Sequence, residues 1–518
     1  MSAILSADDL NDFISPGVAC IKPVQDVPAS HESNESGEVE IQIDSEGNPL
    51  EISKIDGKQT SLTPAQISLA DCLACSGCIT SAEEVLVAQH SHQELVKALK
   101  LKDKIFVASI SQQSRASLAM AYDLPVETID KLLVNLLADQ MGFQKVVGTS
   151  LGRKFSLINE AKYVMANRGK DSKPILSSIC PGWVLYAEKT HPYVLPMISP
   201  VKSAQQITGC LLKTLTADEF HVPKSQVYHL SIMPCFDKKL ESARPEIFGD
   251  TIPDVDCVLT PKELIALLEE ENYQLVPKIE PKSLTLPIEE VYDLVAPKYW
   301  PYPRYSWTND PGSSSGGYAF NYLRFFQNDL ISKGYNESDF SMKVISGKNS
   351  DVFEMRLMYK EERVASAAIV NGFRNIQNLV RKLKPNAKTV GRVNPLAARR
   401  RARMKEPEST SVEETADPSK VDYVEIMACP SGCINGGGQI KPPNDVSEKD
   451  WIGEVLSKYN TVSTFDLSLH PGEVQRLKDY RDLFEQSYGV NEDRLLKTHF
   501  NEVEKPTDPT AILVGSKW

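Results

Sequence analysis

The sequence predicts an α/β fold in which mainly parallel sheets are flanked by helices. Between about residues 101 and 387, short apolar runs typical of buried strands alternate with segments of helical periodicity. Repeated strand–helix units of this kind build parallel sheets with helices outside them. In addition, three apolar runs lead directly into loops that carry cysteines. Loops beyond the carboxyl ends of parallel strands usually carry the chemistry of such folds, so we expect a functional site there.

Composition limits the classes of protein to which the chain can belong. Of its 518 residues, 41% are hydrophobic and 24% charged, as in globular proteins with room for several domains. The net charge of −12 argues against broad nucleic-acid binding. The N-terminus does not resemble a secretory signal, and no run approaches the ~18 apolar residues of a membrane helix. We therefore expect a cytoplasmic protein whose ten cysteines are metal ligands rather than disulfides.

Residues 1–100 are expected to form a small N-terminal module. Its segment 27–37 is polar and is expected to be disordered. The alternating apolar residues that follow, around an acidic turn with a glycine, predict a β-hairpin. A cysteine triplet comes next, and a helical stretch then runs to about Lys102.

The core of the chain, residues 101–387, contains the strand–helix alternation. Strands are expected at 105–110, 145–150, 227–235, 256–260, 342–346, 353–359 and 364–372, and a strand that runs into a loop at 174–183. Helices are expected at 111–137, 201–215, 261–270 and 373–383. Residues 388–421 are expected to be a flexible charged linker; its basic run, 399–405, could instead serve nuclear targeting or anion binding. Residues 422–518 are expected to be the C-terminal part of the core, with helices at 448–458 and 473–485 and a tail ending in Trp518.

A first set of cysteines, Cys72, Cys75 and Cys78, has the spacing C-x2-C-x2-C. This spacing supplies three ligands of a ferredoxin-type iron–sulfur cluster, whereas zinc sites more often use pairs of C-x2-C. The usual fourth cysteine of such a run is missing. Cys20 is the only other cysteine in the first 179 residues, and it is our candidate for the fourth ligand.

A second set of four cysteines comes from three separate loops. Cys180 lies in SSICPGW, Cys235 in IMPCFDKKLE, and Cys429 and Cys433 in MACPSGCINGGGQ. Four thiolates are the number that a [4Fe–4S] cluster requires. The three consecutive glycines of the last loop would let backbone N–H groups approach an anionic cluster. Cys210 and Cys257 remain, and we interpret both as small buried hydrophobic residues.

These loops resemble the three signature motifs of the iron-only ([FeFe]) hydrogenases. The hydrogenase motifs TSCCP-x-W, MPC-x2-K-x2-E and E-x-MAC-x2-GC-x2-GGGQ correspond here to residues 177–183, 233–241 and 425–439. Lys238 and Glu241 match hydrogenase residues near the diiron site, and a surface salt bridge is the alternative interpretation of this pair. The resemblance implies a hydrogenase-like core of two lobes.

One departure from the hydrogenase motifs bears directly on activity. Ile179 replaces the cysteine that delivers protons to the diiron site, and an isoleucine cannot transfer a proton. The N-terminal cysteine block and the terminal tryptophan are similar instead to the eukaryotic hydrogenase-like branch, and the chain resembles its fungal members. These are the cytosolic iron–sulfur protein assembly factors, also called nuclear prelamin A recognition factor-like proteins.

The resemblance to this branch implies a non-enzymatic role in delivering pre-assembled clusters to cytosolic and nuclear apoproteins. It implies two [4Fe–4S] clusters, one held by Cys20, Cys72, Cys75 and Cys78 and the other by Cys180, Cys235, Cys429 and Cys433. The implied partners are a WD40-propeller cluster-targeting complex, which Trp518 could anchor, and an upstream scaffold NTPase complex. We expect a cytoplasmic location, with a nuclear location as a further option. The N-terminal cluster should be the more labile, because loops rather than a folded core hold it.

Two other functions are open on the sequence alone. A hydrogenase or another iron–sulfur redox enzyme would keep the three loops but would need a proton route past Ile179. A structural zinc protein would use the same thiolates without sulfide. The chain is not expected to be the scaffold NTPase, because its nearest candidate for a phosphate-binding loop, SGKNS at 346–350, lacks the leading glycine and has asparagine after the lysine.

Overall fold

The structure, a computed structural model, describes residues 39–43, 49–53, 59–61, 90–170, 173–278, 282–385, 414–443 and 445–503. The chain divides into two compact units, Met1–Cys72 and Leu73–Trp518. In the first unit, three strands form an antiparallel sheet: β1 Val39–Ile43, β2 Pro49–Ser53 and β3 Gln59–Ser61. The pairing of β1 with β2 confirms the predicted hairpin, to which β3 adds a third strand.

Several predictions concern residues outside those that the structure describes. They are the disordered segment 27–37, the basic run 399–405, the ligands of the first cluster (Cys20, Cys72, Cys75 and Cys78) and the terminal Trp518.

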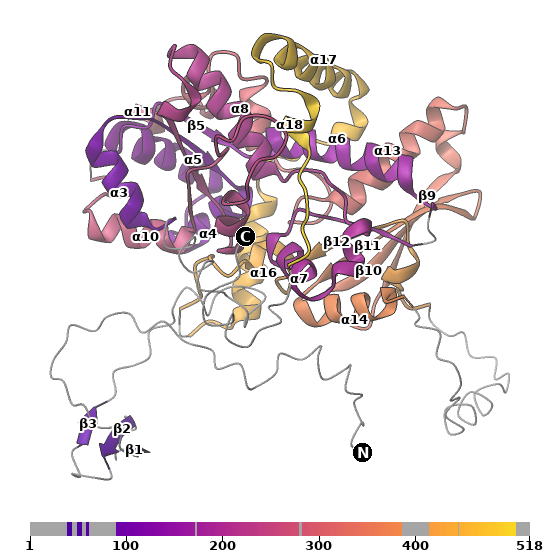
Figure 1. Cartoon of the computed structure of the whole chain (residues 1–518), viewed down its shortest axis with the longest axis horizontal. Coiled ribbons are helices and arrows are strands. Elements are labelled where there is room, and N and C mark those ends of the chain that lie inside the picture. Colours follow the sequence, from indigo (N-terminus) through magenta and orange to yellow (C-terminus); the bar gives the residue numbers. More distant parts are fainter. Residues whose placement is uncertain are drawn as a thin grey trace. The chain divides into compact units, whose positions relative to one another are not determined.

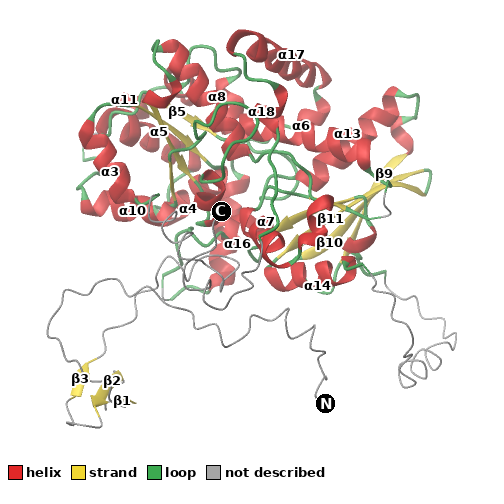
Figure 2. Cartoon of the chain, in the orientation of Figure 1, coloured by secondary structure: helices red, strands yellow, loops and turns green. Residues whose placement is uncertain are grey.

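The second unit contains two sheets, which are yellow in Figure 2. The four-stranded sheet is parallel, with the order β5 Lys145–Gly148, β4 Ile105–Ile110, β7 Val227–Ile232 and β8 Cys257–Leu259. The five-stranded sheet has the order β6 Ile175–Leu176, β12 Tyr423–Met427, β11 Glu362–Asn371, β10 Val352–Tyr359 and β9 Phe340–Ser346. In it β6, β12 and β11 are parallel, whereas β9, β10 and β11 form an antiparallel meander. The connections within the meander are too short for the crossover that a parallel pair requires.

Helices surround both sheets, and Figure 1 labels most of them. They are α3 His92–Leu101, α4 Gln112–Ala121, α5 Val126–Val134, α6 Ser150–Asn167, α7 Pro181–Thr190, α8 Ala204–Glu219, α9 Asp237–Ser242, α10 Pro261–Glu270, α11 Lys282–Thr285, α12 Ile288–Val295, α13 Tyr318–Ser332, α14 Phe373–Leu383, α16 Glu448–Asn460, α17 Pro471–Tyr488 and α18 Glu492–Leu496. A layer of three helices joins the sheets: α8 packs on β4 and β7, α13 packs on β10, β11 and β12, and α6 contacts both helices. The predicted α/β fold of two lobes is thereby confirmed.

Two predicted elements are wrong in extent. The single helix expected at 111–137 is interrupted between α4 and α5, where Asp123 has a φ of +49° and Pro125 precedes α5. Proline disfavours helical geometry at the residue before it, which explains the break. Residues 174–183, expected to be a strand that runs into a loop, contain the short strand β6 and a loop at 177–180, but the loop ends earlier than expected because α7 begins at Pro181. Cys180 therefore occupies the junction between a short strand and a helix.

The segment predicted to be a linker, 388–421, is described only from residue 414. There the Ala416 N–H donates to the carbonyl of Ser346 on β9 at 3.1 Å, and Glu414 forms an ion pair with Arg356 on β10 at 2.5 Å. Residues 414–421 thus contact the five-stranded sheet before the chain enters β12.

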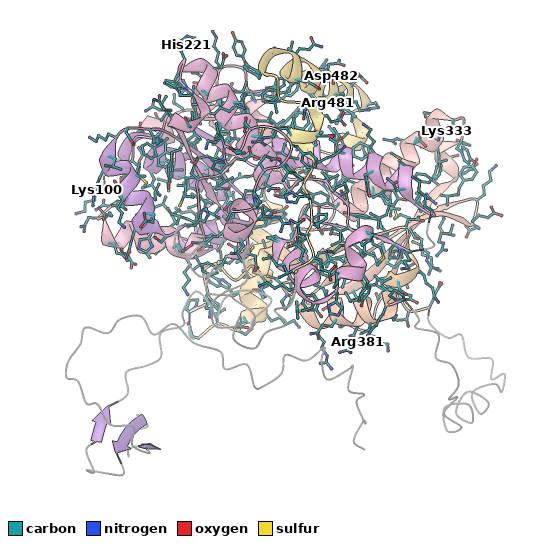
Figure 3. All side chains as sticks on the ribbon, in the orientation of Figure 1. Lys100, His221, Lys333, Arg381, Arg481 and Asp482 are labelled. Carbon is teal, nitrogen blue, oxygen red and sulfur yellow. The ribbon has the colours of Figure 1, made fainter. Side chains whose placement is uncertain are left out.

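Charged side chains such as those of Lys333 and Arg481 extend outward from the helices, as Figure 3 shows. Lys333 forms an ion pair with Asp329 at 2.6 Å, and Arg481 with Asp482 at 2.5 Å. Such exposed pairs contribute little to stability, so the free energy of folding comes mainly from the apolar cores of the two lobes. Among the described helices, none has the length and apolar character needed to cross a membrane.

Candidate metal centre

Four cysteines of the core lie just beyond the carboxyl ends of strands, where the sequence predicts a functional site. Cys180 follows β6, Cys235 follows β7, and Cys429 and Cys433 follow β12. Strands β6 and β12 are neighbours in the five-stranded sheet, whereas β7 belongs to the four-stranded sheet. The four thiols are therefore contributed by both lobes.

Direct hydrogen bonds connect the three loops that carry these cysteines. The Ala428 N–H donates to the Cys180 sulfur at 3.3 Å, which connects the loop after β12 with the loop after β6. The Gly438 N–H donates to the Pro234 carbonyl at 3.0 Å, which connects the first of these loops with the loop after β7. Since Pro234 is adjacent to Cys235, the two contacts together fix the relative positions of all four cysteines.

The glycines of the 427–439 loop allow close backbone packing between the cysteine loops. A Cβ atom on Gly436 would lie 2.3 Å from the Pro234 carbonyl oxygen, and one on Gly438 would lie 2.2 Å from the Thr260 methyl carbon. Thr260 is held in place as the N-cap of α10, in a capping box with Glu263. At these two positions the absence of a side chain serves contact between loops, rather than the approach to an anionic cluster that we expected.

The four thiols share one electrostatic environment. Burial raises the pKa of each of them, to about 12 for Cys180. The negative charge of Asp237 further raises the pKa values of Cys180, Cys235 and Cys429, and each of these three is also raised by at least one of the other thiols. Without bound metal, the four groups are neutral thiols close enough to affect one another's ionisation. Binding to cations would allow them to ionise together.

The chemistry of the four donors suits an iron–sulfur cluster. Cys180 is buried, and Cys235, Cys429 and Cys433 are half-buried. A structural zinc site takes four ligands within about 2.3 Å of a single centre. A cubane cluster instead takes one thiolate on each of its irons, so its ligands surround a larger volume. Among the described residues, no group of three His, Cys, Asp or Glu side chains is arranged to hold a single ion.

Lys238 and Glu241, the pair that matches hydrogenase residues, lie on α9 beside this site. Their side chains form an ion pair at 2.8 Å, but both are buried, so the alternative of a surface salt bridge is wrong. The Lys238 ammonium also donates to the Ile179 carbonyl at 3.1 Å. The Ile179 side chain is buried in the apolar core of the five-stranded-sheet lobe and carries no titratable group.

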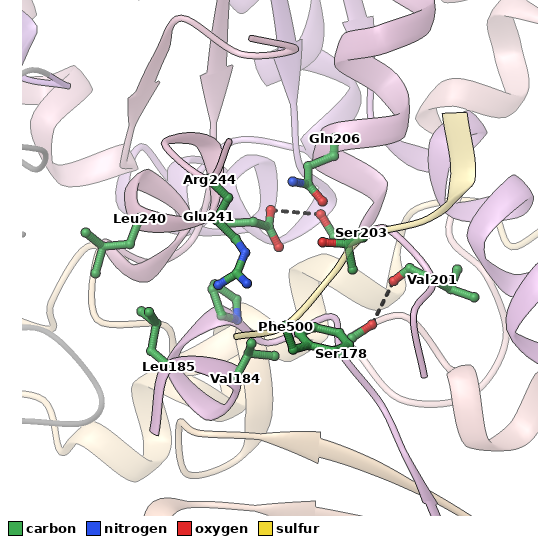
Figure 4. Close-up of a pocket in the computed structure, with 12 residues that line it drawn as sticks. Ser178, Val184, Leu185, Val201, Ser203, Gln206, Leu240, Glu241, Arg244 and Phe500 are labelled. Carbon is green, nitrogen blue, oxygen red and sulfur yellow. Dashed lines mark hydrogen bonds between the residues drawn. The ribbon is translucent and has the colours of Figure 1, made fainter. Parts of the chain in front are cut away.

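Figure 4 shows a small cavity next to Glu241, which is also lined by Ser203, Ser178, Arg244 and Phe500 among others. Glu241 accepts a hydrogen bond from the Ser203 hydroxyl at 2.8 Å. The cavity volume is about 20 Å³, which is room for a water molecule and not for an organic substrate.

Two residues near Cys433 were not identified from the sequence. The Cys433 N–H donates to the Ser315 hydroxyl at 2.9 Å, and the charge of the buried Arg153 acts to lower the Cys433 pKa against the larger effect of burial. Ser315 belongs to the run SSSGG at 313–317, and this serine- and glycine-rich composition is a detectable signal of a loop. Arg153 lies in the helical segment α6, and nothing in its local sequence distinguishes it from a surface arginine.

Cys210 and Cys257 are buried in α8 and β8, which confirms the prediction that they occupy core positions. They pack in separate apolar clusters, Cys210 beside α18 residues and Cys257 within the four-stranded sheet, in its edge strand β8.

Comparisons with known proteins agree with this geometry. A family model described as "Iron only hydrogenase large subunit, C-terminal domain" matches residues 104–437. A variant of the apo [FeFe]-hydrogenase HydA1 from Chlamydomonas reinhardtii superimposes with a TM-score of 0.55, covering 80% of this chain and 99% of that chain at 18% identity. At that identity, the likeness shows the shared fold.

Curated relatives match over much more of the sequence. Proteins called "Cytosolic Fe-S cluster assembly factor NAR1" are 62% identical in Lodderomyces elongisporus and 56% identical in Candida albicans, each over 100% of both chains. The protein of that name in Saccharomyces cerevisiae is 39% identical over 88% of this chain and 90% of its own.

Proposed function

The chain belongs to the family of cytosolic Fe-S cluster assembly factors that share the iron-only hydrogenase fold, and from this we propose that it binds two [4Fe–4S] clusters and helps to transfer pre-assembled clusters to apoproteins in the cytosol and nucleus. The observation that carries this proposal is the meeting of four cysteines from both lobes at the carboxyl ends of β6, β7 and β12.

The core cluster would be held by Cys180, Cys235, Cys429 and Cys433. A bound cluster would supply the positive charge on iron that keeps these buried thiols ionised. The protein positions them by the hydrogen bonds between their loops, one of which is donated by the Ala428 N–H to the Cys180 sulfur itself. Hydrogen bonds to cluster ligands are one of the means by which proteins set the reduction potential of a cluster.

The second cluster would be held by Cys20, Cys72, Cys75 and Cys78 in the N-terminal module. We expect it to be the more labile, because the core ligands extend from two packed sheets whereas these come from a cysteine triplet and one distant residue. The more labile cluster is the better candidate for transfer. Faster loss of the core cluster to a chelator or to oxygen would contradict this assignment.

We further propose that the chain is not a hydrogenase. Ile179 occupies the position at which hydrogenases carry the proton-transferring cysteine, and its buried aliphatic side chain cannot take over that step. Anaerobic hydrogen evolution by the reconstituted protein would support the alternative, a hydrogenase or another iron–sulfur redox enzyme.

The proposed partners are those implied for an assembly factor of this branch. Apo iron–sulfur proteins would receive the clusters, a scaffold NTPase complex would act upstream, and a WD40-propeller targeting complex would bind the tail through Trp518. An aromatic residue at a chain end can serve as an anchor for a partner's pocket. Deleting Trp518 and measuring the affinity for the targeting complex tests this contact without disturbing either cysteine set.

The function is tested by counting iron and acid-labile sulfide, with EPR of the reduced protein, in wild type and in Cys75→Ala and Cys433→Ala variants. We expect about eight irons per chain in wild type and about four in each variant, with each variant lacking a different EPR signal. Zinc without sulfide would contradict the proposal. An unchanged count in Cys433→Ala would show that the core cysteines do not hold a cluster.

A further inference from the structure

We infer that Lys238 is a positioning residue for the core cluster, and that it connects the Cys180 loop with the Cys235 helix while placing a buried positive charge next to the Cys180 loop. This inference rests on the proposed function, because it concerns the occupant of the four-cysteine site. It gives the lysine of the second motif a role that requires no diiron centre.

The geometry of Lys238 supports the first part of this role. Its Nζ atom donates to the Ile179 carbonyl at 3.1 Å, and Ile179 immediately precedes Cys180. Lys238 lies three residues after Cys235, in the first turn of α9. One side chain therefore fixes the distance between a cysteine loop of the five-stranded-sheet lobe and one of the four-stranded-sheet lobe.

Further contacts hold Lys238 in this orientation. Glu241 accepts from its ammonium at 2.8 Å and also accepts from the Ser203 hydroxyl at 2.8 Å, a contact visible in Figure 4. The Gln205 amide donates to Glu241 at 3.1 Å and to the Lys238 carbonyl, also at 3.1 Å. Because α8 fixes the carboxylate and the carboxylate fixes the ammonium, Lys238 has little freedom to turn toward another partner.

The second part of the role is electrostatic. Lys238 is 8% exposed, and its ammonium lies 3.1 Å from the carbonyl of the residue that precedes Cys180, so a buried positive charge stands next to one ligand loop of the proposed cluster. A cluster ligated by four thiolates is anionic, and the protein charge around a cluster is one determinant of its reduction potential. Removing a nearby positive charge stabilises the oxidised form relative to the more negative reduced form, so the midpoint potential should become more negative.

The neighbouring residue, Lys239, provides a matched control. It is also a buried lysine on α9 with an ion pair, to Glu263 at 2.6 Å, but its second contact is the His90 carbonyl at 2.6 Å. Removal of either ammonium leaves a buried carboxylate without its cation, so both changes should lower stability by a similar mechanism. The Lys238 ammonium donates a hydrogen bond to the Cys180 loop, whereas the polar contacts of the Lys239 ammonium are with His90 and Glu263, and it lies 5.7 Å from the centre of the Phe236 ring.

The experiment uses the full chain carrying Cys75→Ala. Because this substitution removes one proposed ligand of the N-terminal cluster, any cluster that remains is assigned to the core site. Lys238→Met, Lys238→Gln, Lys238→Arg and Lys239→Met are made in this background and reconstituted. The midpoint potential is measured by redox titration followed by EPR, and iron loss to a chelator is timed. We expect a more negative potential and faster iron loss in Lys238→Met and Lys238→Gln, recovery of the potential in Lys238→Arg, and a wild-type potential in Lys239→Met.

The outcomes separate this inference from the proposed function. If the Cys75→Ala background holds no cluster, the assignment of the core site is wrong. If it holds a cluster and both neutral variants at position 238 keep its potential, the role of Lys238 is refuted. An equal shift in Lys239→Met would also refute it, because the effect would then follow from lost stability. The Lys238→Gln variant answers the question if Lys238→Met does not fold.

Discussion

Replacing Gly436 with alanine should disrupt the contact between two cysteine loops. The new Cβ atom would lie 2.3 Å from the Pro234 carbonyl oxygen, and ordinary contact begins at 3.4 Å. The two backbones must therefore separate by about 1 Å, because neither contact atom belongs to a flexible side chain. The Gly438 N–H···Pro234 bond, at 3.0 Å, would be lost or lengthened in the process.

The cost can be estimated from these two effects. Inserting a methyl group into a closed contact costs about 1–3 kcal/mol, and a lost backbone hydrogen bond adds about 1 kcal/mol. We therefore expect Gly436→Ala to lower the free energy of unfolding by about 2–4 kcal/mol. Since Pro234 precedes Cys235, the displacement also moves one thiol away from the other three, and iron per chain after reconstitution should fall.

Gly453→Ala is the matched control. Gly453 is exposed in the interior of α16, and a Cβ atom there would meet nothing within 4 Å. Alanine should stabilise this helix by about 0.5–1 kcal/mol. Urea unfolding of both cluster-free variants and iron counts after reconstitution make the comparison. If Gly436→Ala unfolds at the same urea concentration as wild type and retains its iron, the contact with Pro234 does not constrain the site.

Three further predictions concern the core. Replacing Cys210 or Cys257 with alanine should leave iron per chain unchanged, and loss of about four irons would place that cysteine in a cluster. Arg115→Met should lower the free energy of unfolding, measured in urea, by about 3–5 kcal/mol, because it leaves the buried Asp130 carboxylate without the guanidinium that pairs with it at 2.5 Å. A decrease of under ~1 kcal/mol would contradict this. Burial lowers the pKa of His229 to about 4, from 6.5 in the unfolded chain. As the pH falls from 6.5 to 4, only the unfolded state therefore binds this proton, and the free energy of unfolding should decrease by about 3 kcal/mol. The His229→Gln variant should lose less stability over that range in urea titrations, and an equal loss would show that His229 is not responsible.

The strands that lead to the core cysteines could be predicted because each is a short, buried apolar run. The runs before Cys235 and Cys429 both appear as strands, β7 and β12. Local signals for the loops were weaker. Ile175–Leu176 is the whole of β6, and a loop at 177–180 separates it from α7, which begins with Pro181 at its first position. Pro125 was a signal in the sequence for the break in the helix predicted at 111–137, but the helical periodicity of the residues on both sides obscured it.

Contacts between distant segments could not be predicted in the same way. The approach of Gly436 to Pro234 joins positions about 200 residues apart, and the hydrogen bond between Ser315 and Cys433 joins positions 118 residues apart. Such contacts depend on how the two lobes pack through α6, α8 and α13, and hydrophobic periodicity does not specify that packing. The sequence placed the core cysteines in loops that follow predicted strands, whereas the groups that hold these loops together became visible only in the folded chain.

The wide separation of the core cysteines constrains when a cluster can enter the site. Cys180 and Cys235 lie on one side of the long segment that contains β9 to β11, and Cys429 and Cys433 lie after it. The four thiols can meet only when both sheets have formed and the lobes have packed. Because burial keeps these thiols neutral, binding of an iron–sulfur cluster must also be accompanied by loss of their protons. On the proposed assignment, a cluster bound by all four cysteines therefore stabilises the contact between the lobes. It would resist release more strongly than a cluster in the N-terminal module, and this difference is the physical reason for assigning transfer to the N-terminal site.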